Sequence, residues 1–192
     1  SPDITSLFRS PPCYRINERP GVDGRPRDER HRDAKKTQVA LDFIQKKSSD
    51  LETPWLFWLG LSQPHPNFLA LQKYWDLYTD KEIDMPDIRQ NDLENLHLVY
   101  QSMRHFKRVA THIPEEQVRR ARIGYYGMIT ELDEYIGQVW DALEEKGQLE
   151  NTIFIYTSDH GESLGDHGMW YKNNLYENAA HVPLIIFGPG LP

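Results

Sequence analysis

The sequence predicts an α/β fold with a mostly parallel central sheet, and two observations support this prediction. Short apolar runs rich in β-branched and aromatic residues occupy 55–62, 152–157 and 182–187, and such runs are typical of strands buried on both faces. Between the first and second runs, apolar residues recur at steps of three and four over 115–146, which indicates a helix. Strands that alternate with helices favour a parallel sheet covered by helices.

The N-terminal half of the chain is predicted to alternate loops and helices around the first apolar run. Residues 1–32 are polar and rich in proline and glycine, which predicts a loop-rich arm. Apolar residues return at helical spacing over 33–47, and weaker patterns predict helices over 69–78 and 93–109. The apolar run 55–62 is too short for a buried helix and predicts a strand.

The helix over 115–146 has the clearest pattern in the sequence. A proline followed by two glutamates stands at 114–116, where a helix N-terminus favours these residues, and Lys146 with Gly147 is typical of a C-terminal end. The apolar positions that form its predicted buried face are Val118, Ala121, Tyr125, Met128, Leu132, Ile136, Val139 and Leu143.

Composition argues against several classes of function. The 22 Lys and Arg residues are outnumbered by 29 Asp and Glu residues, and a chain with a net charge of −7 is a poor partner for nucleic acid. The longest apolar stretch, 55–61, is far shorter than the roughly 20 residues that cross a bilayer, so no membrane partner is expected. Cys13 is the single cysteine and lies in no activating motif, which predicts an unreactive loop thiol.

Polar side chains follow two of the predicted strands, at the ends where open α/β sheets bind ligands. His65 follows the run 55–62, and Asp159 and His160 follow the run 152–157. A carboxylate and an imidazole at a rigid strand end are ligands that divalent metal ions use. A plainer interpretation stays open, in which Asp159 caps a turn and His160 is a partly exposed polar residue.

Lys172 and His65 also have a structural and a functional interpretation. A lysine by itself is most often a solvated surface cation. In the structural interpretation, the histidine between two prolines is a loop residue with no part in binding or catalysis. Glycines at 161, 165 and 168 permit a ligand to approach the backbone closely, which moderately favours a binding site in this part of the chain.

A longer run of residues resembles a known family. Residues 157–172 read TSDHGESLGDHGMWYK and, with HVPLII at 181–186, resemble the second signature of the sulfatases, which belong to the alkaline-phosphatase superfamily. The resemblance is strongest to choline-sulfatase-like and phosphonate-monoester-hydrolase-like members. It implies an alkaline-phosphatase-like α/β/α sandwich, incomplete at both ends, with a loop-rich arm over 1–32 and the middle of one sulfatase catalytic domain over 33–192.

The resemblance implies roles for four residues. Asp159 and His160 match the family's late pair of metal ligands, and Lys172 matches a lysine that binds the ester oxygens and stabilises transition-state charge. His65 matches a histidine near the leaving-group oxygen, where it can donate a proton. The family's usual ion is Ca²⁺, while an imidazole ligand also suits Mn²⁺ or Fe²⁺.

The resemblance also implies what these residues lack. The family's nucleophile lies in a Cys-or-Ser-x-Pro-Ser-Arg motif and is oxidised to formylglycine, and no such motif occurs in the 192 residues. The early acidic pair that completes the metal site has no match either. We therefore expect the nucleophile to lie outside this stretch of chain, and residues 1–192 to be inactive by themselves.

The expected reaction is the hydrolysis of a small-molecule sulfate monoester. A phosphonate monoester or phosphodiester hydrolase on the same scaffold is one alternative, and a non-catalytic binding module that retains the fold is another. Choline-sulfatase-like members are commonly oligomers, so a homo-oligomer is a further expectation. Family members occur in the cytoplasm and in the periplasm, and the sequence does not decide between these compartments.

Overall fold

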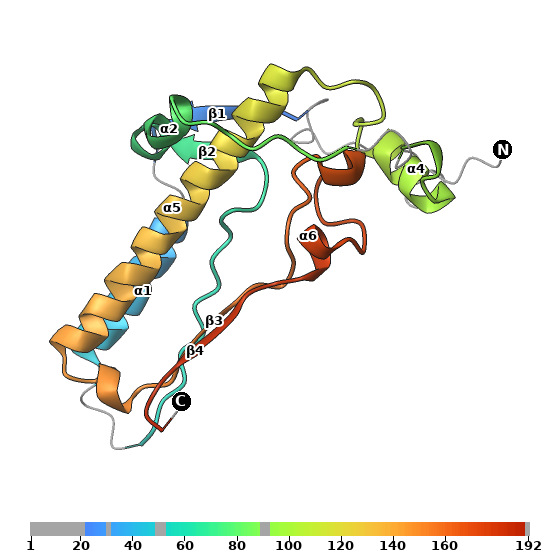
Figure 1. The fold of residues 1–192 in the computed structure, drawn as a ribbon. Coiled ribbons are helices and arrows are strands. Elements are labelled where there is room, and N and C mark those ends of the chain that lie inside the picture. The colour runs from blue at the N-terminus through green and yellow to red at the C-terminus, as the bar shows by residue number, and fades with distance from the viewer. Residues whose placement is uncertain (1–21, 30–31, 49–52, 89–92, 191–192) are drawn as a thin grey trace.

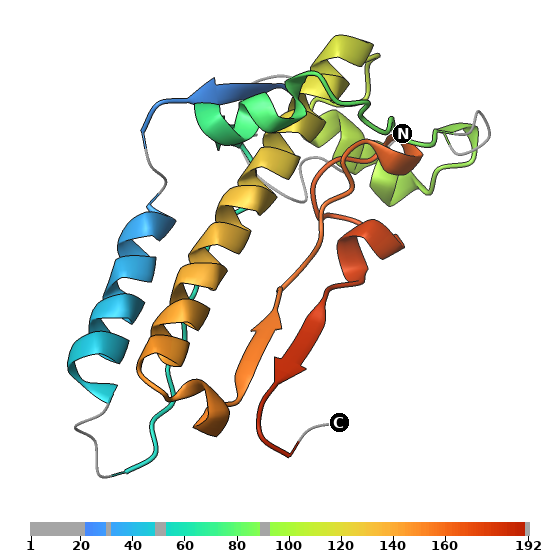
Figure 2. The ribbon, with the colours of Figure 1, turned by 60° about the vertical axis from the view of Figure 1, so that its left-hand side comes forward.

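The computed structural model describes residues 22–29, 32–48, 53–88 and 93–190, and it confirms the α/β class (Figure 1). One long helix, α5, runs through the molecule, and Figure 2 shows α1, α5 and the β3–β4 pair side by side. In chain order the elements are β1 (Gly24–Arg27), α1 (Asp33–Lys46), β2 (Phe68–Leu71), α2 (Gln72–Thr79), α4 (Leu98–Phe106), α5 (Glu115–Glu145), η3 (Leu149–Asn151), β3 (Phe154–Thr157), η4 (Asp166–Gly168), α6 (Glu177–Ala180) and β4 (Leu184–Phe187).

Helix α5 confirms the helix predicted over 115–146. Pro114 is its N-cap residue, and Glu115 and Glu116 occupy its first turn, where carboxylates stabilise the partial positive charge of the helix end. Gly147 follows the C-cap with a positive φ of 64°, which glycine adopts without steric cost. Most of the predicted apolar positions are buried: Val118, Ala121, Met128, Leu132, Val139 and Leu143.

Helix α1 confirms the helix predicted over 33–47, and it packs beside the C-terminal half of α5. Ala40 and Ile44 lie in one buried cluster with Val139 and Leu143 of α5. These residues recur at helical spacing in both sequences, so each helix presents one apolar face to the other.

The first sheet, a parallel pair of β1 and β2, contains a strand that the sequence did not predict. Gly24, which pairs with Phe68 of β2, lies in the region expected to be a loop-rich arm. Residues 1–21 of that arm, Cys13 among them, lie outside the described residues. A Cβ on Gly24 would come within 1.9 Å of the Arg120 carbonyl oxygen, so glycine here lets β1 lie directly against α5. Strand β2 takes the first residues of the helix predicted over 69–78, and α2 follows it.

The second sheet is an antiparallel pair of β3 and β4, which lie inside the two strands predicted over 152–157 and 182–187. Trp140 of α5 packs against both strands, with its ring centroid 5.6 Å from that of Phe154 and 4.7 Å from that of Phe187. This contact joins the sheet to the long helix and brings the end of β3 close to the middle of the molecule (Figure 2).

The prediction of a strand over 55–62, a segment that the structure describes in full, is wrong. This segment has no strand assignment, and Leu56 and Trp58 are 88% and 83% exposed. A strand needs a neighbouring chain to accept and donate its backbone hydrogen bonds, and β3 and β4 pair with each other instead. Trp55 and Leu59 pack against the α1–α5 cluster, which holds one side of the segment in place.

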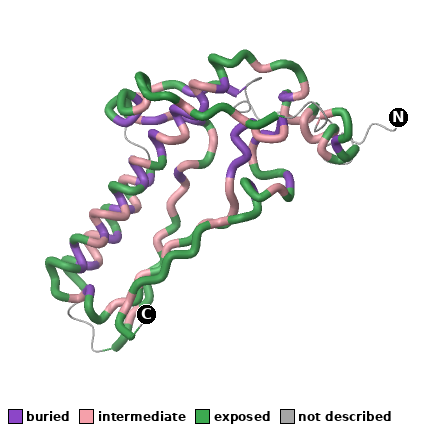
Figure 3. Tube along the Cα trace, viewed as in Figure 1, coloured by how far each residue is buried: buried purple, intermediate pink, exposed green. Residues whose placement is uncertain are grey.

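Buried residues follow α5, the β1–β2 region and the loop from 162 to 170, whereas β4 is exposed along its whole length (Figure 3). The two core clusters therefore lie on the faces of α5. Among the described helices, none is both long enough and apolar enough to cross a membrane.

Candidate active site

Two loops form the candidate site. The first contains His65 and leads into β2, and the second begins with Asp159 and His160 directly after β3 and ends at Lys172. The structure brings the four residues singled out in the sequence together. His65 and His160 have ring centroids 5.9 Å apart, and Lys172 Nζ lies 2.6 Å from His160 Nε2.

The hydrogen bonds of His160 define the state of its ring. Its Nδ1 lies 2.7 Å from the Gly161 carbonyl oxygen, which can only accept, so Nδ1 carries the proton. Nε2 then keeps its lone pair and accepts a hydrogen bond from the Lys172 ammonium group at 2.6 Å. A neutral histidine fixed through Nδ1 has the form in which imidazole binds a metal ion.

Asp159 lies beside this imidazole and faces solvent. Its carboxylate oxygen Oδ2 is 3.7 Å from His160 Nε2, and its side chain is 86% exposed. The two side chains present a carboxylate oxygen and an imidazole nitrogen next to each other, a donor set that suits a divalent cation. Among the described residues, no group of three or more His, Cys, Asp or Glu side chains forms a fuller metal site.

The His65 loop is held by two buried carboxylates. Asp33, the first residue of α1, accepts hydrogen bonds from the backbone N–H groups of Ser62 and Gln63 at 2.6 and 2.8 Å. Glu131, in the middle of α5, accepts one from the Gln63 side chain at 2.6 Å and also pairs with Arg27. Both acids are fully buried, so each has its charge compensated inside the fold and fixes the approach to His65.

The loop from Asp159 to Lys172 is held from α5 by Arg122. This side chain is 3% exposed, donates to the Leu164 carbonyl oxygen at 3.1 Å and pairs with Asp166 at 2.9 Å and with Asp84. A single arginine therefore joins the long helix to the site loop and to the segment before α4 through several donors in a fixed fork.

Glu162 is a buried residue of the same loop. Its Oε1 accepts hydrogen bonds from the backbone N–H groups of Tyr171 at 2.6 Å and Leu164 at 3.2 Å. Burial raises the pKa of Glu162 to about 7, although the backbone hydrogen bonds and the charge of Lys172 act in the opposite direction.

The sequence patterns did not point to the residues that hold the two loops: Asp33, Arg122, Glu131 and Glu162. Charged residues in an amphipathic helix are ordinarily solvated, so nothing in their local pattern marked the three helical ones as buried. Glu162 stood inside the recognised signature, and its place two residues after His160, among the glycines at 161, 165 and 168, is the signal that points to it.

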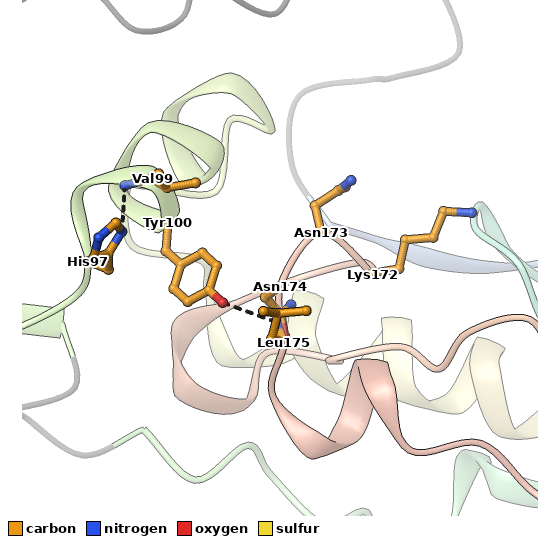
Figure 4. A pocket seen from close by; sticks show the side chains of 7 residues that line it. All are labelled: His97, Val99, Tyr100, Lys172, Asn173, Asn174 and Leu175. Atoms are coloured by element: carbon orange, nitrogen blue, oxygen red, sulfur yellow. Dashed lines mark hydrogen bonds between the residues drawn. The ribbon is translucent and has the colours of Figure 1, made fainter.

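An open pocket of about 640 Å³ lies behind Lys172 (Figure 4). Figure 4 shows the side chains of α4 on one side of this pocket and the amine of Lys172 pointing away from it. The Tyr100 hydroxyl accepts a hydrogen bond from the Leu175 backbone at 3.1 Å, which ties α4 to the turn after Lys172. The residues that line the pocket are His97, Val99, Tyr100, Lys172, Asn173, Asn174 and Leu175.

Comparison with known proteins assigns the chain to a family. The sulfatase family model matches residues 4–192. The chain belongs to the sulfatase family. Sulfatases are metal-dependent hydrolases of the alkaline-phosphatase superfamily, and the adjacent donors Asp159 and His160 are compatible with that dependence.

Two sulfatases among the curated relatives illustrate the similarity. Choline-sulfatase of Rhizobium meliloti (strain 1021) is 33% identical over 161 residues, which are 80% of this chain and 30% of that protein. Arylsulfatase K of Canis lupus familiaris is 33% identical over 170 residues, which are 83% of this chain and 32% of that protein. This sulfatase chain thus spans about a third of the length of the curated relatives it matches.

Solved structures show the same fold. The phosphonate monoester hydrolase SpPMH from Silicibacter pomeroyi aligns with a TM-score of 0.72 and 25% identity, over 98% of this chain and 41% of that chain. The phosphonate monoester hydrolase of Agrobacterium radiobacter aligns with a TM-score of 0.69 and 24% identity, over 98% of this chain and 42% of that chain.

Proposed function

We propose that this chain forms part of the active site of a hydrolase that cleaves a small-molecule sulfate monoester, within a longer sulfatase protein. One observation carries the proposal. The ammonium group of Lys172, the imidazole of His160 and the imidazole of His65 gather at the end of β3, with Lys172 Nζ 2.6 Å from His160 Nε2 and the two rings 5.9 Å apart. A site for a sulfate ester needs a fixed cation and a proton donor, and here both lie beside His160.

Lys172 and His65 serve different ends of the ester in this proposal. The Lys172 ammonium group binds a sulfate oxygen and stabilises the negative charge that develops as the ester bond breaks. His65 donates a proton to the oxygen of the leaving alcohol. Its Nδ1 lies 2.8 Å from the Pro66 carbonyl oxygen, which orients the ring, so the proton that passes to the alcohol is the Nε2 proton of the imidazolium form, and the ring is left neutral afterwards.

Asp159 and His160 would hold the metal ion, which we propose to be Ca²⁺ rather than Mn²⁺ or Fe²⁺. His160 Nε2 would serve the ion in place of its hydrogen bond with Lys172, which would free the ammonium group for the ester, and the ion would neutralise charge on a sulfate oxygen. The described residues supply only two adjacent donors, so we propose that the remaining ligands come from other parts of a longer chain. The formylglycine nucleophile would come from such a part as well, because its motif does not occur in the 192 residues.

The test is a hydrolysis assay of the longer protein on 4-nitrophenyl sulfate, before and after treatment with a chelator. We expect turnover that the chelator abolishes and that Ca²⁺ restores better than Mn²⁺ or Fe²⁺. A longer chain that lacks the Cys-or-Ser-x-Pro-Ser-Arg motif and does not hydrolyse the ester would contradict the proposal and would favour a non-catalytic binding module.

A second candidate is the hydrolysis of phosphonate monoesters or phosphodiesters on the same scaffold. The observation that favours it is the alignment with SpPMH, which covers 98% of this chain. The same protein preparation should be assayed on 4-nitrophenyl sulfate and on 4-nitrophenyl phenylphosphonate. We expect the larger kcat/KM on the sulfate, and the reverse order would move the assignment to the phosphonate hydrolase.

A further inference from the structure

The backbone N–H group of Tyr171, the residue before Lys172, donates a hydrogen bond to a buried carboxylate. Glu162 Oε1 accepts the backbone N–H of Tyr171 at 2.6 Å and the backbone N–H of Leu164 at 3.2 Å. Glu162 is 9% exposed, so neither hydrogen bond is readily replaced by water. The carboxylate thereby ties the end of the loop, next to Lys172, to its beginning, next to His160.

The backbone carbonyl group of Tyr171 accepts hydrogen bonds from Ser163, the residue next to Glu162. Ser163 Oγ donates to the Tyr171 carbonyl oxygen at 2.9 Å, and the Ser163 backbone N–H donates to the same oxygen at 3.3 Å. Asn174 donates to Ser163 Oγ at 2.8 Å. Ser163 and Asn174 are buried, and we call the set Glu162, Ser163, Tyr171 and Asn174 the lysine clamp.

The lysine clamp joins two segments whose side chains meet in the site. His160 precedes Glu162 by two residues, and Lys172 follows Tyr171, so both side chains project from the clamped backbone. Lys172 is exposed and has a long flexible side chain, yet its Nζ lies 2.6 Å from His160 Nε2. A flexible cation reaches a fixed place only if the backbone that carries it is fixed.

We propose that Glu162 is a positioning residue, which sets the place of the Lys172 ammonium group through the backbone of Tyr171. The assignment rests on the proposed function, because the sulfate is the group that Lys172 would bind. Glu162 acts through the loop and not on the ester, since the residue is 9% exposed and its Oε1 is occupied by the two backbone N–H groups.

The first experiment compares Glu162→Gln with Glu162→Leu in the longer sulfatase protein. Glutamine keeps a carbonyl oxygen that can accept both N–H groups, so we expect kcat/KM on 4-nitrophenyl sulfate within about threefold of the parent enzyme. Leucine cannot accept them, and displacement of Lys172 by about 1 Å should lower kcat/KM by about 100-fold. Equal losses in both variants would overturn the proposal.

A double-mutant cycle separates positioning from general damage to the fold. In a Lys172→Ala background the positioned group is already absent, so adding Glu162→Leu should lower kcat/KM by no more than about twofold. A purely structural role predicts instead that the two losses multiply. Multiplicative losses would therefore overturn the proposal.

Ser163→Ala provides a second variant should Glu162→Leu fail to fold, and Ser48→Ala is its matched control. Both serines are buried, donate to a backbone carbonyl oxygen and contact a side-chain amide, but Ser48 lies just after α1, next to Gln148. We expect Ser163→Ala to lower kcat/KM by about tenfold and Ser48→Ala to leave it within about twofold. Equal effects would count against the clamp.

Reductive methylation of lysines, followed by mass spectrometry, tests the clamp without any turnover. In the chelator-treated, metal-free protein, Glu162→Leu should make the Lys172 amine react at least about threefold faster, relative to Lys146, because its hydrogen bond to His160 is lost. An unchanged ratio would overturn the positioning role. If the parent protein hydrolyses neither ester while the ratio still rises, the proposed function fails and the positioning of Lys172 holds.

Discussion

Lys172 places a positive charge next to a neutral imidazole at the surface of the molecule. Its Nζ donates to His160 Nε2 at 2.6 Å, while the proton of that ring stays on Nδ1, toward the Gly161 carbonyl oxygen. The charge thus faces an open region where an anionic ester can approach. At the scale of single residues, the proposed chemistry depends on this cation and on His65 as the proposed proton donor.

The cation should be essential for turnover. We expect Lys172→Ala to lower kcat/KM on 4-nitrophenyl sulfate by about 100- to 1,000-fold, because a preorganised charge at the ester is lost. Lys146→Ala is the control, since Lys146 is exposed at the far end of α5. A Lys172→Ala enzyme that keeps nearly full turnover would remove Lys172 from the site.

The proton donor should matter most for poor leaving groups. We expect His65→Ala to lower kcat by about 100-fold or more on an alkyl sulfate and by much less on 4-nitrophenyl sulfate, whose leaving group needs little protonation. His112→Ala, at an exposed position, serves as the control. Equal losses on the two esters would show that His65 does not protonate the alcohol.

At the scale of elements, close contacts between backbones decide where the strands lie. A Cβ on Gly124 of α5 would come within 2.4 Å of the Phe68 carbonyl oxygen, so β2 packs on the helix without an intervening side chain. Asp33 and Glu131 then reach the His65 loop from α1 and α5. The helices therefore position the site as well as covering the strands.

Two glycines of α5 provide a test of this packing. Gly124→Ala should destabilise the protein by about 1–3 kcal/mol, because the new methyl group meets the backbone of β2. Gly137→Ala should stabilise it by about 0.5–1 kcal/mol, because nothing lies within 4 Å and alanine favours a helix. Urea unfolding of the two variants checks the signs, and a stabilising Gly124→Ala would contradict the close contact.

At the scale of the whole molecule, the β4 side carries unusually exposed apolar residues. Leu184, Ile185, Ile186 and Phe187 of β4 are all exposed, and the segment from Leu56 to Trp58 adds more apolar surface. A patch of this kind is covered in most monomeric proteins. Because the curated relatives are about three times as long as the part that matches, we expect further parts of a longer sulfatase to cover this side.

This coverage can be measured with a dye. Residues 1–192 expressed alone should bind 8-anilinonaphthalene-1-sulfonate strongly, because the apolar side chains of β4 are open to solvent. The longer sulfatase protein should bind it weakly, and an Ile185→Lys variant of residues 1–192 should bind less than its parent. Equal dye binding by the short and the long protein would contradict the coverage.

Much of the fold followed from local patterns, and the exceptions share a cause. The helices over 33–47 and 115–146 were predicted because apolar residues recur at helical spacing, and their buried faces match that spacing. Strand β1 was missed because Gly24–Arg27 has no strand pattern and exists through its pairing with β2, over 40 positions away. The run 55–62 has a strand pattern but lacks a partner among the described residues.

The sequence by itself determined the α/β class, the long helix, and the four residues His65, Asp159, His160 and Lys172, because periodicity and motifs are written in consecutive positions. Only the tertiary structure decided that these residues meet, and that Asp33, Glu131 and Glu162 hold the loops that carry them. The physical reason is burial. A carboxylate becomes an anchor when the fold removes it from water and leaves backbone or side-chain donors as its partners, and no local pattern records which acid that will be.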